Sequence, residues 1–123
     1  MVDVRTLLSW QRIRVTGHSM TPSLLPGDWL LVRHGARVRP GAIVLGRFRA
    51  RPELLVVKRV LAPAADGWWL GSDNPRAGSD SRQHGVADVP AVAVRLWPRG
   101  AGRPPGSARW WGCPIPLPPP DGL

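Results

Sequence analysis

The feature that most constrains the fold is the regular spacing of turn signals between short apolar runs. Residues 26–28, 39–41 and 66–67 read Pro-Gly-Asp, Arg-Pro-Gly and Asp-Gly, combinations that favour tight turns. No stretch between these turns keeps a helical period over any length. Turn signals about every ten residues are typical of antiparallel all-β domains. The sequence therefore predicts a mainly β fold of coiled antiparallel sheets with little helix.

The chain of 123 residues is expected to form one domain with a lead and a tail. Residues 1–12 are the N-terminal lead, residues 13–97 the folded domain, and residues 98–123 a C-terminal tail rich in Pro, Gly and Trp. Strands are expected at residues 12–16, 29–33, 42–48, 54–61, 68–70 and 89–96, with a loop rich in Gly, Ser and Asp at residues 71–85.

The net charge of +9 raises the question of nucleic-acid binding. However, the arginines are scattered along the chain, and no helix-turn-helix, zinc-finger or aromatic stacking motif accompanies them. A preference for arginine codons explains the charge equally well. We therefore expect no specific nucleic-acid partner.

Membrane insertion is not indicated by the sequence. No run approaches the roughly 18 to 20 apolar residues that span a bilayer, and residues 1–15 lack the apolar core of a signal peptide. One cysteine, Cys113, excludes an internal disulfide. We expect a cytoplasmic protein without a transmembrane segment. Trp110 and Trp111 in the tail leave three roles open: packing on the domain, contact with a partner, and peripheral membrane contact.

Lys58 is the only lysine beside sixteen arginines, and it lies in the apolar run of residues 54–61. Arginine stays protonated in proteins, whereas a buried lysine can lose its proton near neutral pH. Lys58 is therefore the one amine side chain that can act as a base. The alternative is an exposed strand lysine that codon bias has left by chance.

Ser19 is a candidate nucleophile because Gly17, two residues before it, permits an unusual backbone and close substrate approach. A serine alone is unreactive and needs an adjacent base. The candidate bases are three histidines, His18, His34 and His84, and the amine of Lys58. A Ser-Lys pair is an established variant of the Ser-His-Asp triad, and the spacing alone does not choose between them.

Three motifs in order carry a resemblance to a known family. Residues 17–24 read Gly-His-Ser-Met-Thr-Pro-Ser-Leu, residues 57–60 read Val-Lys-Arg-Val, and residues 71–85 contain Gly-Ser-Asp-Asn and Asp-Ser-Arg. Over residues 13–97 the chain resembles the signal peptidase I-like serine proteases of the S26 family, with Ser72 as an extra residue in the third motif. The mostly β fold of that family agrees with the predicted strands.

The resemblance implies a role for each matching residue. Ser19 would be the nucleophile and Lys58 its general base, with no metal or cofactor. The backbone N–H of Ser19 would donate to the oxyanion, with Gly17 beside it and Met20 lining the substrate groove. The residues expected to support the loop are Asp73, Asn74, Asp80, Ser81 and Arg82, with an ion pair between Asp80 and Arg82.

Two positions depart from the family pattern. Many signal peptidases have a serine where this chain has Gly17, as a second oxyanion donor. Several have a serine where this chain has Gly78, and that serine orients the lysine. Ser79 and Ser81 are the substitutes that the sequence offers for the second role.

An anchor-free branch of the family matches further. Residues 35–41, 54–59, 67–69 and 77–81 resemble the maturation proteases of nickel-containing superoxide dismutase. That resemblance implies a serine endopeptidase that removes an N-terminal propeptide from the dismutase precursor, which would be its protein partner.

Two other functions stay open. A LexA-like self-cleaving regulator shares the Ser-Lys pair, but needs a DNA-binding region and a cleavage site ahead of the serine, and eighteen residues precede Ser19. A non-catalytic basic binding module would not need both Ser19 and Lys58.

Overall fold

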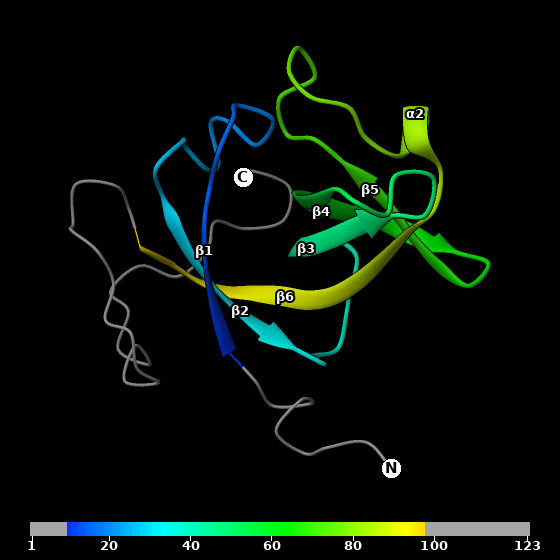
Figure 1. Ribbon diagram of the computed structural model, residues 1–123, viewed down its shortest axis with the longest axis horizontal. Helices are drawn as coiled ribbons and strands as arrows, with labels where there is room; N and C mark the ends of the chain where they lie inside the picture. Colours follow the sequence, from blue (N-terminus) through cyan, green and yellow to red (C-terminus); the bar gives the residue numbers. More distant parts are fainter. Residues whose placement is uncertain (1–9, 98–123) are drawn as a thin grey trace.

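The computed structural model describes residues 10–97. This part of the chain contains six strands and one short helix (Figure 1). The strands are β1 (Trp10–Arg14), β2 (Trp29–His34), β3 (Ile43–Phe48), β4 (Leu55–Ala64), β5 (Gly67–Gly71) and β6 (Ala87–Trp97). The helix, α2 (Ser81–His84), lies between β5 and β6.

All six strands belong to one antiparallel sheet in the order β1-β2-β6-β3-β4-β5. Strand β6 is the longest and curves across the molecule, so that its first part pairs with β3 and its last part with β2 (Figure 1). A further pairing of Trp68 with Ala87 brings β5 back to β6. The strands β6, β3, β4 and β5 therefore curl into a small closed barrel, and β1 and β2 extend it on one side.

The core fills the two halves of this curled sheet. One cluster packs β2, β3 and β6 against the loop after β1, and it includes Met20, Leu24 and Leu30. A second cluster lies inside the barrel around Phe48, Val60 and other apolar side chains. Because β2 contributes Leu30 and Val32 to the first cluster and Leu31 to a tryptophan-rich group on its other face, both faces of β2 are covered.

The predicted mainly β fold with little helix is confirmed. Strands β2 and β3 match their predicted positions to within one residue. Strand β4 runs three residues further than predicted, through Pro63, because this end lies beyond the part that pairs with β3. Strand β1 starts at Trp10, inside the predicted lead, because it pairs residue by residue with Trp29–Arg33 of β2.

Helix α2 lies within the segment that the sequence predicted to be a loop. Its signal was nevertheless present, since Asp80 and Gln83 form a capping box. The rest of the predicted lead, residues 1–9, and the predicted tail, residues 98–123, lie outside the described residues. Within residues 10–97, no helix has the length and apolar composition that crossing a membrane requires.

Leu24 and Leu25 provide a matched test of the core. Leu24 is fully buried, whereas its neighbour Leu25 is 40% exposed. We expect Leu24→Ala to lower the free energy of unfolding by about 2 to 5 kcal/mol, because it leaves a cavity below the loop that carries Ser19. Leu25→Ala should change it by less than about 0.5 kcal/mol. Urea unfolding of both variants measures the difference, and equal effects would contradict the packing described here.

Candidate active site

Ser19 lies in the loop between β1 and β2, which is tied to itself at both ends. The Val15 N–H donates to the Asp28 carbonyl at 2.7 Å, and the Gly27 N–H donates back to Val15 at 2.9 Å. The Leu24 N–H donates to the Met20 carbonyl at 2.8 Å. These bonds fix the ends of the loop next to the sheet, so the backbone around Ser19 is held in place.

A second loop, residues 72–80 between β5 and α2, clamps the serine loop through Asn74. The Asn74 N–H donates to the carbonyl of Ser19 at 2.8 Å. Its side-chain amide donates to the carbonyl of His18 and to the hydroxyl of Thr21, both at 3.0 Å. Asn74 thus binds Ser19, the residue before it and a residue two positions after it.

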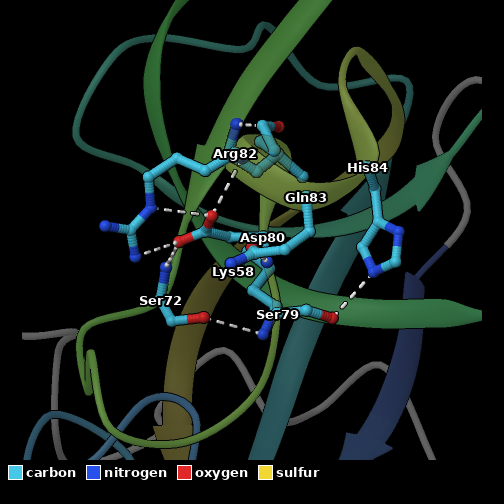
Figure 2. Close-up of polar contacts among 9 residues, drawn as sticks. Lys58, Ser72, Ser79, Asp80, Arg82, Gln83 and His84 are labelled. Atoms are coloured by element: carbon cyan, nitrogen blue, oxygen red, sulfur yellow. Dashed lines mark hydrogen bonds and ion pairs between the residues drawn. The ribbon is translucent and has the colours of Figure 1, made fainter.

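Lys58 lies in the middle of β4, and its side chain is buried, with 4% of the residue exposed. It shares a strand face with Val56 and Val60, which pack in the barrel interior. Burial lowers the pKa of Lys58 below its usual range, while the negative charge of Asp80 raises this pKa in part. The amine donates a hydrogen bond to the Ser72 hydroxyl at 2.9 Å (Figure 2).

Ser19 and Lys58 meet at Gly78. A Cβ added to Gly78 would lie 2.7 Å from the Cβ of Ser19 and 3.1 Å from Nζ of Lys58. The two side chains therefore face the same point from two different segments, the β1–β2 loop and strand β4. Gly78 has φ +75, which a side chain rarely permits, so both the backbone and the space require glycine here.

The loop 72–80 is fixed to β4 by a largely buried ion pair, in which the side chains of Arg59 and Asp73 are 8% and 17% exposed. The guanidinium of Arg59 donates to both carboxylate oxygens of Asp73, at 2.9 and 2.7 Å, and to the carbonyl of Gly41 at 2.8 Å. The hydroxyl of Ser23 donates to the same carboxylate at 2.6 Å. Burial alone would raise the pKa of Asp73, but the hydrogen bonds from Arg59 and Ser23 outweigh it and hold this pKa below its usual value.

Asp80 caps helix α2, and its carboxylate points to Arg82 and to the N–H of Ser72 (Figure 2). Its carboxylate accepts from the backbone N–H of Arg82 at 3.0 Å and forms the predicted ion pair with the Arg82 side chain at 3.2 Å. Burial raises the pKa of Asp80, but these bonds and a backbone bond from Ser72 leave it lowered. Ser81 is buried, and its hydroxyl accepts from the N–H of Leu70 at 2.8 Å, which joins α2 to β5.

A groove of about 420 Å³ runs beside Ser19 and Lys58. Its walls come from β1 and the serine loop on one side and from the first half of β4 on the other. Met20 lies in the wall and also in the core, with 2% of the residue exposed. Gly17 has φ +74, and nothing lies within 4 Å of the point where its Cβ would be. The lining residues are Gln11, Arg12, Ile13, Arg14, Val15, Thr16, Ser19, Met20, Leu45, Leu54, Leu55, Val56, Val57 and Lys58.

The structure places two of the candidate histidine bases against other partners. Nε2 of His34 lies 2.7 Å from the side-chain oxygen of Gln11. Nε2 of His84 lies 2.7 Å from the hydroxyl of Ser79, and its ring packs on Phe48. His18 is exposed and precedes Ser19 in the chain. Lys58 is thus the candidate base whose nitrogen the structure brings to the same point as Ser19.

Two contributions were missed by the sequence reasoning. Ser72 was noted only as an extra residue, yet its hydroxyl binds Lys58. Arg59 was named only as a neighbour of Lys58, yet it carries the buried ion pair with Asp73. Strand alternation could have separated the two basic residues, because neighbours on a strand point to opposite faces.

Comparison with known proteins assigns a class to this arrangement. A family model described as Peptidase S24-like matches residues 11–88, which is more than half of the chain. The matched segment contains Ser19, Lys58 and the loop 72–80. No curated protein matches the chain significantly. The match supports a serine peptidase-type hydrolase, and the mostly β structure agrees with it.

Removing the Asp73 carboxylate tests the buried brace. We expect Asp73→Asn to lower the free energy of unfolding by about 3 to 5 kcal/mol near pH 7, because it leaves the Arg59 charge buried without its partner. Because the pKa of Asp73 is lower in the folded protein than in the unfolded chain, its negative charge stabilises the fold at any pH above the pKa of the unfolded chain. Since the wild-type protein loses this contribution as the pH falls below about 4, the two unfolding curves should then converge.

Asp66→Asn is the matched control for this change. Asp66 pairs with Arg49 at 2.7 Å, but the two side chains are 73% and 40% exposed. An exposed pair contributes about 0 to 1 kcal/mol. Equal destabilisation by the two substitutions in urea unfolding would show that the Arg59–Asp73 pair has no special structural role.

Proposed function

Since the chain belongs to the Peptidase S24-like family of serine peptidases, we propose that it is a Ser-Lys endopeptidase with Ser19 as nucleophile and Lys58 as general base. The observation that carries the proposal is the meeting of the two side chains at Gly78. A serine hydroxyl beside a buried amine is the arrangement that this chemistry requires.

The proposed mechanism assigns a group to each step. Neutral Lys58 takes the proton of the Ser19 hydroxyl as its oxygen attacks the scissile carbonyl carbon. The protonated amine then gives this proton to the leaving amine, and the peptide C–N bond breaks. Water hydrolyses the Ser19 ester, with Lys58 again acting as base. Burial supports this cycle, because it lowers the pKa of Lys58 and so favours the neutral amine at working pH.

The charge that develops on the carbonyl oxygen needs hydrogen-bond donors. We assign the backbone N–H of Ser19 as one donor, because it lies at the nucleophile on a loop held by Asn74. Gly17 supplies no side-chain donor, and its open surroundings leave room for the substrate backbone to approach.

The groove suits an extended polypeptide. Strand β1 pairs with β2 along one side, and residues 55–58 of β4 pair with β3. The described pairings of β5 with β4 begin only at Arg59. Strand β1 and the first half of β4 both border the groove. A substrate strand could add to these strands by backbone hydrogen bonds.

For the substrate we propose the precursor of nickel-containing superoxide dismutase, from which the enzyme would remove the N-terminal propeptide. The support is the resemblance of residues 35–41, 54–59, 67–69 and 77–81 to the maturation proteases of this dismutase. A place in the signal peptidase-like branch is part of this proposal, and its support is the resemblance of the motifs at residues 17–24, 57–60 and 71–85.

Substitution of the two proposed catalytic residues tests the mechanism. We expect Ser19→Ala and Lys58→Ala each to reduce trimming of the purified precursor by on the order of 10³-fold or more. Lys58→Arg should be equally inactive, because arginine stays protonated. Mass spectrometry of the precursor after incubation measures the cleavage. Full trimming by Lys58→Arg would exclude the Ser-Lys mechanism, and Leu25→Ala serves as the active control.

The pH dependence provides a separate test. The cleavage rate should rise with pH and level off above the lowered pKa of Lys58. Asp80→Asn removes the negative charge that raises the pKa of Lys58, so the rising limb should move to lower pH. Asparagine retains the helix cap. Asp66→Asn is the charge-matched control, and a limb that moves to higher pH in Asp80→Asn would contradict the assigned base.

A second function, self-cleavage, is favoured by the family match itself, because LexA-like regulators share the Ser-Lys pair. It predicts that the purified protein shortens on incubation at alkaline pH and that Ser19→Ala stays intact. An intact mass combined with trimming of the precursor would favour the endopeptidase.

A further inference from the structure

The amine of Lys58 ends a long side chain, and burial among apolar residues does not by itself fix its direction. Four rotatable bonds leave the nitrogen several positions within the barrel interior. A base must present its lone pair to the proton that it removes. A hydrogen-bond partner near Nζ must therefore hold the amine in one position. The amine donates a side-chain hydrogen bond to the Ser72 hydroxyl at 2.9 Å (Figure 2).

Gly78 cannot provide that partner. It has no side chain, and its φ of +75 disfavours one. An added Cβ would lie only 2.7 Å from the Cβ of Ser19, closer than such atoms approach. A serine at this position would therefore displace the nucleophile or the amine.

The other two hydroxyls of this loop and helix are engaged elsewhere. Ser79 Oγ lies 2.7 Å from Nε2 of His84 and points away from the amine (Figure 2). The hydroxyl of Ser81 is buried and accepts from the N–H of Leu70. Neither of the substitutes that the sequence offered binds Lys58 in the structure, whereas Ser72 does.

Ser72 is itself held from both sides. It directly follows Gly71, the last residue of β5, and precedes Asp73, whose carboxylate is fixed by Arg59. Its N–H points to the Asp80 carboxylate at 3.4 Å. A hydroxyl on so constrained a segment can hold a flexible amine in one place.

We propose that Ser72 is the positioning residue of Lys58, and that it fills the role that the glycine at position 78 leaves vacant. The inference rests on the proposed Ser-Lys function. With one N–H donated to Ser72, the neutral amine has its lone pair restricted in direction, and the Ser19 side chain lies on the Gly78 side of the nitrogen. Ser72 touches the proposed base and is not among the residues that line the groove.

Kinetics of precursor cleavage test the positioning role. We expect Ser72→Ala to lower kcat by about 10²-fold through misplacement of the base, with little change in KM. Ser72→Thr keeps a hydroxyl and should recover most of the rate. Ser79→Ala removes a hydroxyl from the same loop and should behave like the wild-type protein. Wild-type kinetics in Ser72→Ala would overturn the inference, and so would a loss of rate that Ser79→Ala reproduces.

The single lysine permits a second measurement that needs no substrate. Growth with lysine labelled with ¹³C at Cε gives one side-chain signal, from Lys58, whose shift with pH reports its ionisation. Ser72→Ala should move this titration to lower pH, because the hydroxyl that accepts from the charged amine is lost. Ser79→Ala should leave it unchanged. An unchanged titration in Ser72→Ala would contradict the contact.

The two measurements separate the possible failures. If the wild-type protein does not cleave the precursor but the Lys58 titration responds to Ser72→Ala, the proposed function is wrong and the Ser72–Lys58 coupling stands. If cleavage depends on Ser19 while Ser72→Ala changes neither the rate nor the titration, the positioning inference alone is wrong. Thermal unfolding of each variant identifies any loss of rate caused by misfolding.

Discussion

The buried ion pair between Arg59 and Asp73 joins the segments that form the candidate site. Arg59 belongs to β4, the strand that carries Lys58, and Asp73 belongs to the loop that carries Ser72 and Gly78. Through Ser23, the same carboxylate also reaches the loop that carries Ser19. One desolvated pair, in which each guanidinium nitrogen of Arg59 donates a hydrogen bond, thus connects three segments that are distant in the sequence. Such pairs add little net stability compared with apolar packing, but removing one partner is costly.

Lys58 introduces the opposite energetic effect. Its charged form is disfavoured by burial, so the folded state binds its proton less tightly than the unfolded chain does. The charged lysine therefore destabilises the fold fully below its lowered pKa, and this cost is relieved as the pH rises from that value to the pKa of the unfolded chain. A residue that is unfavourable for stability and suited to proton transfer is common at sites of chemistry.

Much of the fold was predictable, because it depends on local signals. Short apolar runs between Gly, Pro and Asp turns favour strands, and the predicted positions of β2 and β3 are right to within one residue. The ends of other strands depend on their partners and were predicted less well. Strand β4 continues through Pro63, beyond the predicted end at residue 61, because β5 pairs there and β3 does not. Helix α2 begins at the capping box of Asp80 and Gln83, and the three-residue spacing of this motif is present in the sequence.

The sequence by itself determined which groups can do the chemistry. It contains one lysine, Lys58, within a predicted apolar strand, and a serine, Ser19, two residues after Gly17. Only the tertiary structure decided which residue serves the lysine. Ser72, Ser79 and Ser81 are equivalent by composition and nearly so by position, but the backbone turn at Gly78 and the cap at Asp80 point their hydroxyls in three directions. Side-chain direction in a loop depends on dihedral angles that distant contacts impose, and these include the Arg59–Asp73 ion pair.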